Sequence, residues 1–221
     1  MQREIFIRKL NNTELNNQTT NDAYIRVSST VLKEVPVNFF ETLNSQSIKV
    51  IDLSTKRRVD NWVRFQFYPS NGEYRIANLS SIYKNYQAEA GDKLCIRKVK
   101  IDSIFHYEIY MVTYEKLCFK YSKSNKAFEI LNENSPLLSQ IGEQTVLLNY
   151  GNQEINSRIK IKFSKKKRTD SPSETNYYSI DNLPDNIYSQ MSQSNYLEIT
   201  SYNESYNLCL EKSWSYTKID R

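Results

Sequence analysis

Histidine, glycine and cysteine are scarce in this sequence, and each scarcity excludes a class of site. With His106 as the single histidine, paired-histidine nuclease sites and most histidine-based catalytic triads are excluded. The four glycines stand apart from one another, so no glycine-rich loop can cradle a phosphate. The three cysteines show no CxxC spacing, which favours buried, reduced thiols over disulfides or metal ligands. We therefore expect neither a metal nor a cofactor.

Long apolar runs and paired acidic motifs are also missing. No run reaches the roughly 18 apolar residues that a membrane span needs, and no signal-peptide core follows the first residues. Common metal-dependent nucleases need Glu-x-Lys or Asp-x-Lys beside another acid, and neither spacing occurs here. We expect a cytoplasmic protein without membrane contact, and a chain that is not an enzyme by itself.

Basic residues are in modest excess, because 30 Lys and Arg against 25 Asp and Glu give a net charge of +5. That balance permits nucleic-acid binding without establishing it. Apolar residues make up 39% of the 221 residues, enough for one large or two modest cores. We expect two domains, residues 1–112 and 113–221. The many Asn, Lys, Ile and Tyr residues are typical of an AT-rich bacterial genome, so asparagine counts carry little weight alone.

Strand-like alternation dominates the first half and predicts a mainly β fold with short helices. Seven short runs are rich in β-branched or aromatic residues and are bounded by turn residues. They span residues 4–8, 24–27, 48–52, 62–67, 74–76, 93–96 and 107–111. Helices are predicted at 29–40, where Pro36 must break or end the helix, and at 80–87. The order ββαβββαββ favours a closed or nearly closed barrel, since open strand edges need protection.

These elements resemble the B3-like DNA-binding pseudobarrel of plant transcription factors and of bacterial restriction-enzyme recognition domains. The resemblance covers about residues 3–112. It rests on a polar arm at 9–21, an aromatic strand at 62–67 and an Ala-Gly-Asp turn at 90–92, in that order. The first arm departs from related arms in lacking glycine. The resemblance implies a seven-stranded pseudobarrel that binds double-stranded DNA sequence-specifically. It further implies the recognition module of a restriction system, with catalysis by a nuclease or translocase domain or subunit elsewhere.

Two polar arms and the nearby cations are the candidate DNA contacts. Asn and Gln suit adenine and Arg suits guanine in the major groove, whereas cations facing phosphate add affinity without reading sequence. The predicted base-reading residues of the first arm are Asn11, Asn12, Asn16, Asn17, Gln18 and Asn21, and those of the second arm are Ser70, Asn71 and Arg75. The predicted phosphate contacts are Lys9, Arg26, Lys56, Arg57, Arg58, Arg64, Lys165, Lys166, Lys167 and Arg168.

The second half is also β-rich, with alternating runs at 146–150, 158–163, 177–180, 196–199 and 206–210. The segment 74–83 recurs loosely as 178–188 with one inserted residue, a pattern compatible with a degenerate second pseudobarrel and also with chance. The cations at 165–168 suit either a solvated loop or an auxiliary DNA clamp.

Two other functions stay open. One is a protein-interaction or regulatory β domain without specific DNA binding. The other is a hydrolase whose site is assembled from scattered carboxylates such as Asp52, Asp60 and Glu108.

Overall fold

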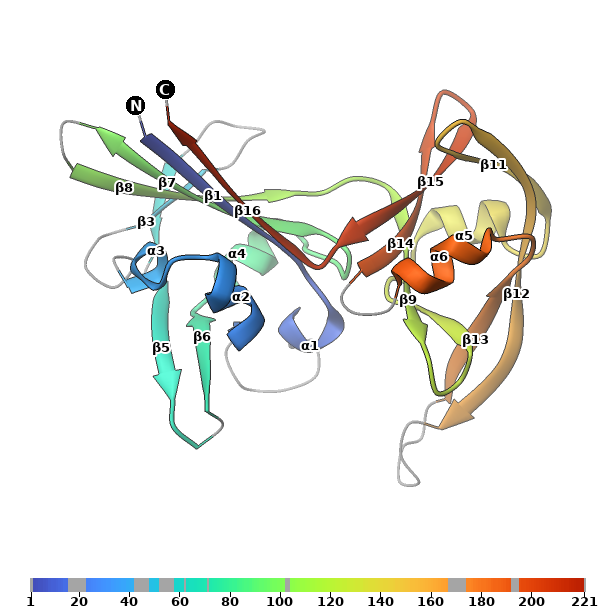
Figure 1. The fold of residues 1–221 in the computed structure, drawn as a ribbon, viewed down its shortest axis with the longest axis horizontal. Coiled ribbons are helices and arrows are strands. Elements are labelled where there is room, and N and C mark those ends of the chain that lie inside the picture. The colour runs from blue at the N-terminus through green and yellow to red at the C-terminus, as the bar shows by residue number, and fades with distance from the viewer. Residues whose placement is uncertain are drawn as a thin grey trace. The chain divides into compact units, whose positions relative to one another are not determined.

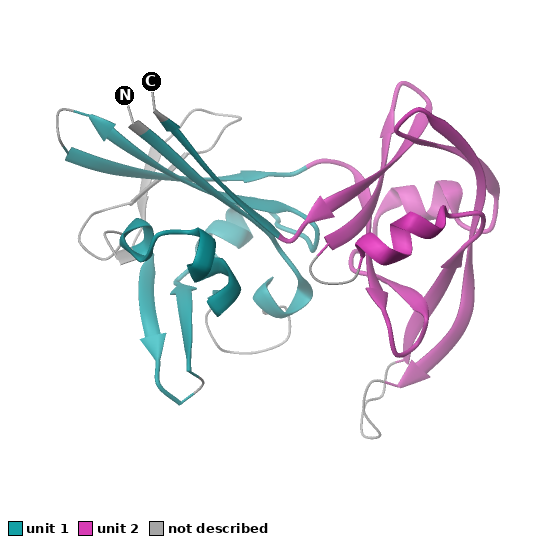
Figure 2. Cartoon of the chain, viewed as in Figure 1, with its two compact units in different colours: residues 1–113, 214–221 teal, residues 114–213 magenta. Residues whose placement is uncertain are grey.

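The computed structural model is mostly β with short helices, which confirms the predicted fold class at that level. It describes residues 2–15, 23–41, 48–51, 58–61, 63–70, 72–101, 104–166, 174–191 and 195–220. The chain divides into two compact units (Figure 2): unit 1 comprises residues 1–113 and 214–221, and unit 2 comprises residues 114–213. The boundary between the units follows residue 113, one residue after the expected boundary at residue 112. The last eight residues, expected in the second domain, belong to unit 1.

Unit 1 contains nine strands and four helices among its described residues (Figure 1). They are β1 (Gln2–Lys9), α1 (Asn12–Leu15), β2 (Ile25–Val27), α2 (Ser29–Glu34), α3 (Val37–Glu41), β3 (Ile48–Ile51), β4 (Arg58–Asn61), β5 (Arg64–Tyr68), β6 (Glu73–Ala77), α4 (Ser80–Asn85), β7 (Lys93–Ile101), β8 (Ile104–Val112) and β16 (Trp214–Asp220). Pro36 separates α2 from α3 as predicted, because the residue before a proline is pushed to extended conformation, and Val35 has φ −99° and ψ 121°.

The strands of unit 1 form two sheets, not the closed barrel expected over the first half. One sheet has the order β16-β1-β7-β8-β3-β4, and the other has the order β2-β6-β5. β16 pairs antiparallel with β1 from Gln2↔Asp220 to Arg8↔Trp214, so it occupies the edge of β1 at which a barrel would close. This pairing joins positions more than 200 residues apart, and no local pattern in the sequence encodes it.

An aromatic cluster fills the core of unit 1 and includes a residue from the C-terminal strand. Phe6, Phe39 and Phe40 are at most 1% exposed, and the ring centroids of Phe6 and Phe40 lie 5.3 Å apart. Phe40 stacks on Phe65 at 5.1 Å, and Phe39 meets Tyr216 of β16 at 5.7 Å. Such aromatic pairs each add about 0.5–1.5 kcal/mol beyond burial. The cluster therefore anchors both the β2-β6-β5 sheet and β16.

Unit 2 is a closed seven-stranded barrel with the strand order β10-β13-β12-β11-β15-β14-β9. Its elements are β9 (Lys116–Ser122), β10 (Ala127–Ile130), α5 (Pro136–Ile141), β11 (Thr145–Tyr150), β12 (Gln153–Lys166), β13 (Glu174–Ile180), α6 (Asp185–Gln190), β14 (Asn195–Tyr202) and β15 (Ser205–Lys212). The first two strands were missed from the sequence. Alternate apolar side chains such as Phe119, Leu148 and Ile199 fill the interior and are each 0% exposed. Across the described residues of both units, no helix is long and apolar enough to cross a membrane.

The two units share one strand topology. Unit 2 follows the order ββαβββαββ. Unit 1 follows it too when β4 with β5 and α2 with α3 are each counted as one interrupted element, and when α1, between β1 and β2, and the added strand β16 are left aside. Each unit has one parallel strand pair among its described strands, β3–β8 in unit 1 and β11–β15 in unit 2. These pairs occupy corresponding places, as do the antiparallel pairs β1–β7 and β9–β14. β1 of unit 1 corresponds to β9 of unit 2. The edge of β9 that pairs with β10 corresponds to the edge of β1 that pairs with β16.

The repeated sequence segments fall at the same place in this topology. Tyr74 lies in β6 and Tyr178 lies in β13. A short turn after each strand leads into a helix, α4 after β6 and α6 after β13. Asn78 and Asn182 both adopt positive φ, 65° and 57°, a conformation that asparagine tolerates better than most residues. The two segments therefore make the same turn from a strand into a helix.

Candidate nucleic-acid interface

The three-stranded sheet β2-β6-β5 has one apolar and one polar face. Side chains alternate along a strand, so Ile25 and Phe65, which both pair with Ile76, share the inner face and are at most 5% exposed. On the outer face the register brings three polar side chains into one row across the strands: Arg26, Arg75 and Gln66. Arg64 is exposed two positions before Gln66 on β5. The hairpin of β5 and β6 thus presents guanidinium and amide groups together.

A carboxylate and two aromatic rings hold Arg75 at the centre of this row. Arg75 Nε donates to Glu73 Oε1 at 2.6 Å, and Arg26 Nε lies 2.6 Å from Glu73 Oε2. The guanidinium carbon of Arg75 lies 4.0 Å from the ring centre of Tyr24 and 4.6 Å from that of Tyr68. Each cation–π contact at a partly exposed site contributes about 0.5–1 kcal/mol. The orientation of Arg75 is therefore fixed before any partner binds.

The remaining donors of Arg75 suit a planar acceptor pair. Its Nε and Nη2 atoms face Glu73 at 2.6 and 2.5 Å, which leaves the Nη1 hydrogens and one Nη2 hydrogen directed away from that carboxylate. Two donors on one planar edge match the O6 and N7 acceptors of guanine. Gln66 lies directly across from Arg75, and its amide matches the donor and acceptor of adenine.

The described part of the first arm is organised as a helix cap. Asn11 Oδ1 accepts from the Glu14 backbone N–H at 3.0 Å, and Glu14 Oε2 accepts from the Asn11 N–H at 3.2 Å, which is a reciprocal capping box. Glu14 also pairs with Arg8 at 2.7 Å, while burial raises the pKa of the Glu14 carboxyl. Asn11 is thus engaged in capping α1, and Asn12 is exposed in the helix. The other predicted first-arm readers, Asn16, Asn17, Gln18 and Asn21, lie outside the described residues.

The predicted phosphate contacts differ in exposure. Lys9 is 1% exposed, so its ammonium group is not presented at the surface as a phosphate contact requires; β1 is an inner strand with neighbours on both sides. Arg26, Arg64, Lys165 and Lys166 are exposed, and the second-arm residue Ser70 is exposed in the turn between β5 and β6. The predicted residues Lys56, Arg57, Asn71, Lys167 and Arg168 lie outside the described residues, as does the side chain of Arg58 in β4.

Three residues of this face were missed in the sequence. Gln66 lies between the two phenylalanines of a run that reads as apolar core, and its outward position follows from that same alternation. Tyr24 was assigned to a predicted strand and Tyr68 to the second arm, after the strand predicted at 62–67. Their contact with Arg75 depends on pairing that only the fold supplies. Phe67 is 45% exposed near the hairpin turn.

Of the three scattered carboxylates considered for a hydrolase, only Glu108 has a described side chain. Glu108 of β8 forms an ion pair with Arg97 of β7, directly opposite on the neighbouring strand. Asp52 lies outside the described residues, and only the backbone of Asp60 is described.

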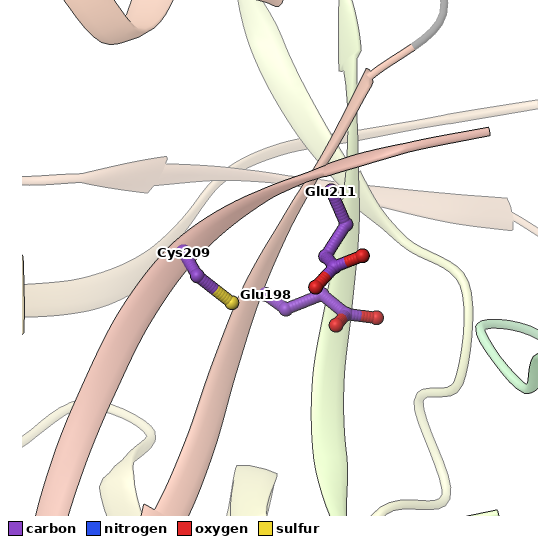
Figure 3. Close-up of side chains that lie close together, drawn as sticks. All are labelled: Glu198, Cys209 and Glu211. Carbon is purple, nitrogen blue, oxygen red and sulfur yellow. The ribbon is translucent and has the colours of Figure 1, made fainter. Parts of the chain in front are cut away.

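One group of candidate metal ligands occurs in the part of unit 2 that the structure describes. The ligand atoms of Glu198, Cys209 and Glu211 lie within 4.8 Å of one another on β14 and β15 (Figure 3). Two carboxylates and a thiol are donors that zinc accepts. Glu198 already accepts a hydrogen bond from the Tyr114 hydroxyl at 2.7 Å, and burial, followed by that hydrogen bond, raises the pKa of Tyr114. Glu198 is buried, whereas Cys209 and Glu211 are half-buried.

A pocket of about 340 Å³ in unit 1 lies beside β16. Within it, Tyr216 donates to Glu4 Oε2 at 2.7 Å. Lys98 donates to the Asn38 carbonyl at 3.1 Å and lies 4.4 Å from the ring centre of Phe105. Burial lowers the pKa of Lys98, and the nearby Glu4 carboxylate opposes that shift. The Tyr216–Glu4 hydrogen bond links β16 to β1, and the Lys98–Asn38 hydrogen bond links β7 to α3.

The sequence matches no known protein-family model and no curated protein. The fold and the site together define a two-unit β protein whose first unit carries a cationic sheet face with a clamped arginine.

Proposed function

We propose that the chain binds double-stranded DNA sequence-specifically through the outer face of the β2-β6-β5 sheet. The observation that carries the proposal is the row of Arg26, Arg75 and Gln66, with Arg75 held by Glu73 and by two tyrosine rings. Reading a base edge requires donors that are fixed before binding, because ordering a flexible side chain costs conformational entropy. Among the described side chains, Arg75 meets that requirement.

The roles within this face follow from exposure and hydrogen-bonding capacity. Arg75 reads guanine through the edge turned away from Glu73, and Gln66 reads adenine beside it. Arg26, which is 62% exposed, and Arg64 neutralise phosphates and fix the register of the hairpin in the major groove. A two-stranded ribbon such as β5 with β6 has the dimensions that the major groove admits.

The resemblance to B3-like pseudobarrels supports a wider proposal. In it, DNA binding by this chain delivers a nuclease or translocase, carried by another domain or subunit, to the recognised sequence of a bacterial restriction system. The order of elements in unit 1, which the second unit shares, supports the pseudobarrel assignment.

A second candidate function is protein binding through the same hairpin. The exposed ring of Phe67, 45% accessible and 4.9 Å from the ring centre of Tyr74, favours it, because aromatic residues are enriched at protein interfaces. Salt separates the two candidates. Binding through phosphates releases counterions and weakens steeply with salt, whereas a largely apolar protein interface does not.

The test is a titration of duplex DNA against the full chain between about 50 and 200 mM salt. The double variant Arg26→Gln with Arg64→Gln removes two phosphate contacts, so the slope of log affinity against log salt should fall by about 1.8. The matched control, Lys84→Gln with Lys120→Gln, removes two exposed cations of α4 and β9 and should leave the slope unchanged. Equal slopes for the two variants, or a wild-type slope near zero, would contradict the proposal.

A further inference from the structure

Strand β12 of unit 2 carries more cations than any other described element of the chain. It carries five exposed cations and one acid: Arg158, Lys160, Lys162, Lys165, Lys166 and Glu154. Arg158 and Lys160 occupy alternate positions ahead of the bulge, so they project from one side of the strand about 6.6 Å apart. Lys162 lies within the bulge between Ile161 and Phe163 and is exposed.

The register places this cation row at the position that the reading face occupies in unit 1. Tyr178 pairs with Phe128 and Ile161, as Tyr74 pairs with Val27 and Phe67. The exposed apolar residues Phe67 and Ile161, 45% and 50% accessible, therefore correspond. Counting from these anchors, Arg158 corresponds to Arg64, Lys160 to Gln66 and Ser179 to Arg75.

The corresponding face of unit 2 lacks the glutamine and arginine proposed to contact bases in unit 1, but it keeps a net positive charge. Lys160 lies opposite Ser179, where unit 1 has Gln66 opposite Arg75. The carboxylate Glu73, which holds Arg75, corresponds to Tyr177, which has no carboxylate to orient a neighbouring cation. A lysine ammonium is a mobile point charge, unlike the planar fork of arginine or the paired donor and acceptor of glutamine.

The neighbouring groups leave these cations accessible. Lys160 pairs with Asp181 at 2.7 Å, with side-chain exposures of 46% and 36%. An ion pair this exposed is worth little and exchanges readily. Lys162 donates to the Lys126 carbonyl at 2.9 Å, which places the ammonium without neutralising it. Glu174 faces Lys166 near the end of the hairpin, so the net positive charge is greatest over residues 158–162.

We infer that Arg158, Lys160 and Lys162 form a second DNA surface that binds the phosphate backbone of the duplex without reading its sequence. The inference rests on the proposed function for the identity of the partner. It gives unit 2 the role of adding affinity, and it gives unit 1 the role of choosing the sequence.

The experiment compares the full chain with the triple variant Arg158→Gln, Lys160→Gln and Lys162→Gln. The control triple variant Lys84→Gln, Lys120→Gln and Lys212→Gln carries the same change of charge at exposed positions on other elements. Three lost phosphate contacts should reduce the slope of log affinity against log salt by about 2.7. Raising the salt from about 50 to 200 mM should therefore weaken DNA binding by the test variant about 40-fold less than it weakens binding by wild type. The single variant Lys162→Gln should reduce the slope by about 0.9.

The preference for a selected duplex over a scrambled one separates this inference from the proposed function. A lower slope with an unchanged preference, seen in the test variant and not in the control, supports the inference. If wild type shows no preference but the test variant still lowers the slope, the inference stands and sequence-specific reading fails. An unchanged slope, a lost preference, or binding of anionic vesicles or duplex RNA in place of duplex DNA would overturn the inference.

Discussion

Oε1 of Glu73 accepts hydrogen bonds from both Nε and Nη2 of Arg75, at 2.6 and 2.5 Å, two positions further along β6. The other carboxylate oxygen pairs with Arg26 on β2, so one buried glutamate orients two arginines of neighbouring strands. Glu73 is 7% exposed and places one negative charge on a face that is otherwise cationic. The proposed reading of DNA depends on this arrangement.

Replacing Glu73 with glutamine tests the orienting role of the carboxylate. The variant loses the charge that orders Arg75 and Arg26 and adds one net positive charge to the face, so affinity for a scrambled duplex should rise while preference for the selected duplex falls. Competition binding with the two duplexes measures both. The control is Glu34→Gln on α2, an exposed acid that should raise affinity for both duplexes slightly and equally.

Replacing Arg75 tests the reading role. Arg75→Ala should weaken binding to the selected duplex by about 1–3 kcal/mol and leave scrambled duplex nearly unaffected. Arg75→Lys should not restore binding, because an ammonium cannot present two donors on a plane or stack between Tyr24 and Tyr68 as a guanidinium does. Full recovery with lysine would show that Arg75 acts only as a charge.

Glu14 makes the stability of unit 1 dependent on pH. Burial raises the pKa of its carboxyl in the folded protein, so folding favours the protonated form. The contribution is present below the ordinary value of 4.5 and is lost as pH rises through the raised folded pKa. The advantage of wild type over Glu14→Gln in unfolding free energy should therefore grow as pH falls from 7 toward 4. Urea unfolding at several pH values measures this, and a constant difference would contradict it.

Tyr216 tests the attachment of β16 to unit 1. Tyr216→Phe keeps the ring that packs on Phe39 but removes the hydroxyl that donates to Glu4 at 2.7 Å. Because the acceptor is a carboxylate only 8% exposed, the change should cost about 1.5–3 kcal/mol of unfolding free energy. Tyr202→Phe, at a position 71% exposed, is the control and should have an effect within about 0.5 kcal/mol. Chemical denaturation of both variants compares them.

Local patterns in the sequence predicted where strands and helices lie better than they predicted which strands pair with each other. Alternation located most strands, and Pro36 located the break between α2 and α3, because both are properties of neighbouring residues. The pairing of β16 with β1 was missed, since it joins the two ends of the chain. Closure of a barrel in the first half was wrong for the same reason: the edge that β1 offers is taken by β16.

The candidate site was predicted in part for a related reason. Arg75 and Arg26 were named from composition and position, but their shared contact with Glu73 requires the cross-strand register. Asparagine has the same side chain whether it caps a helix or reads a base, and Asn11 caps α1. Lys9 was expected at the surface, yet it is 1% exposed.

Selection from a randomised duplex library at physiological salt tests the central claim most directly, with wild type and the double variant Gln66→Ala and Arg75→Ala compared in parallel. Wild type should enrich one short motif that contains adjacent guanine and adenine, and the double variant should retain duplexes without that motif. Retention of all duplexes alike by wild type, or the same motif with both proteins, would contradict sequence reading by the β2-β6-β5 face.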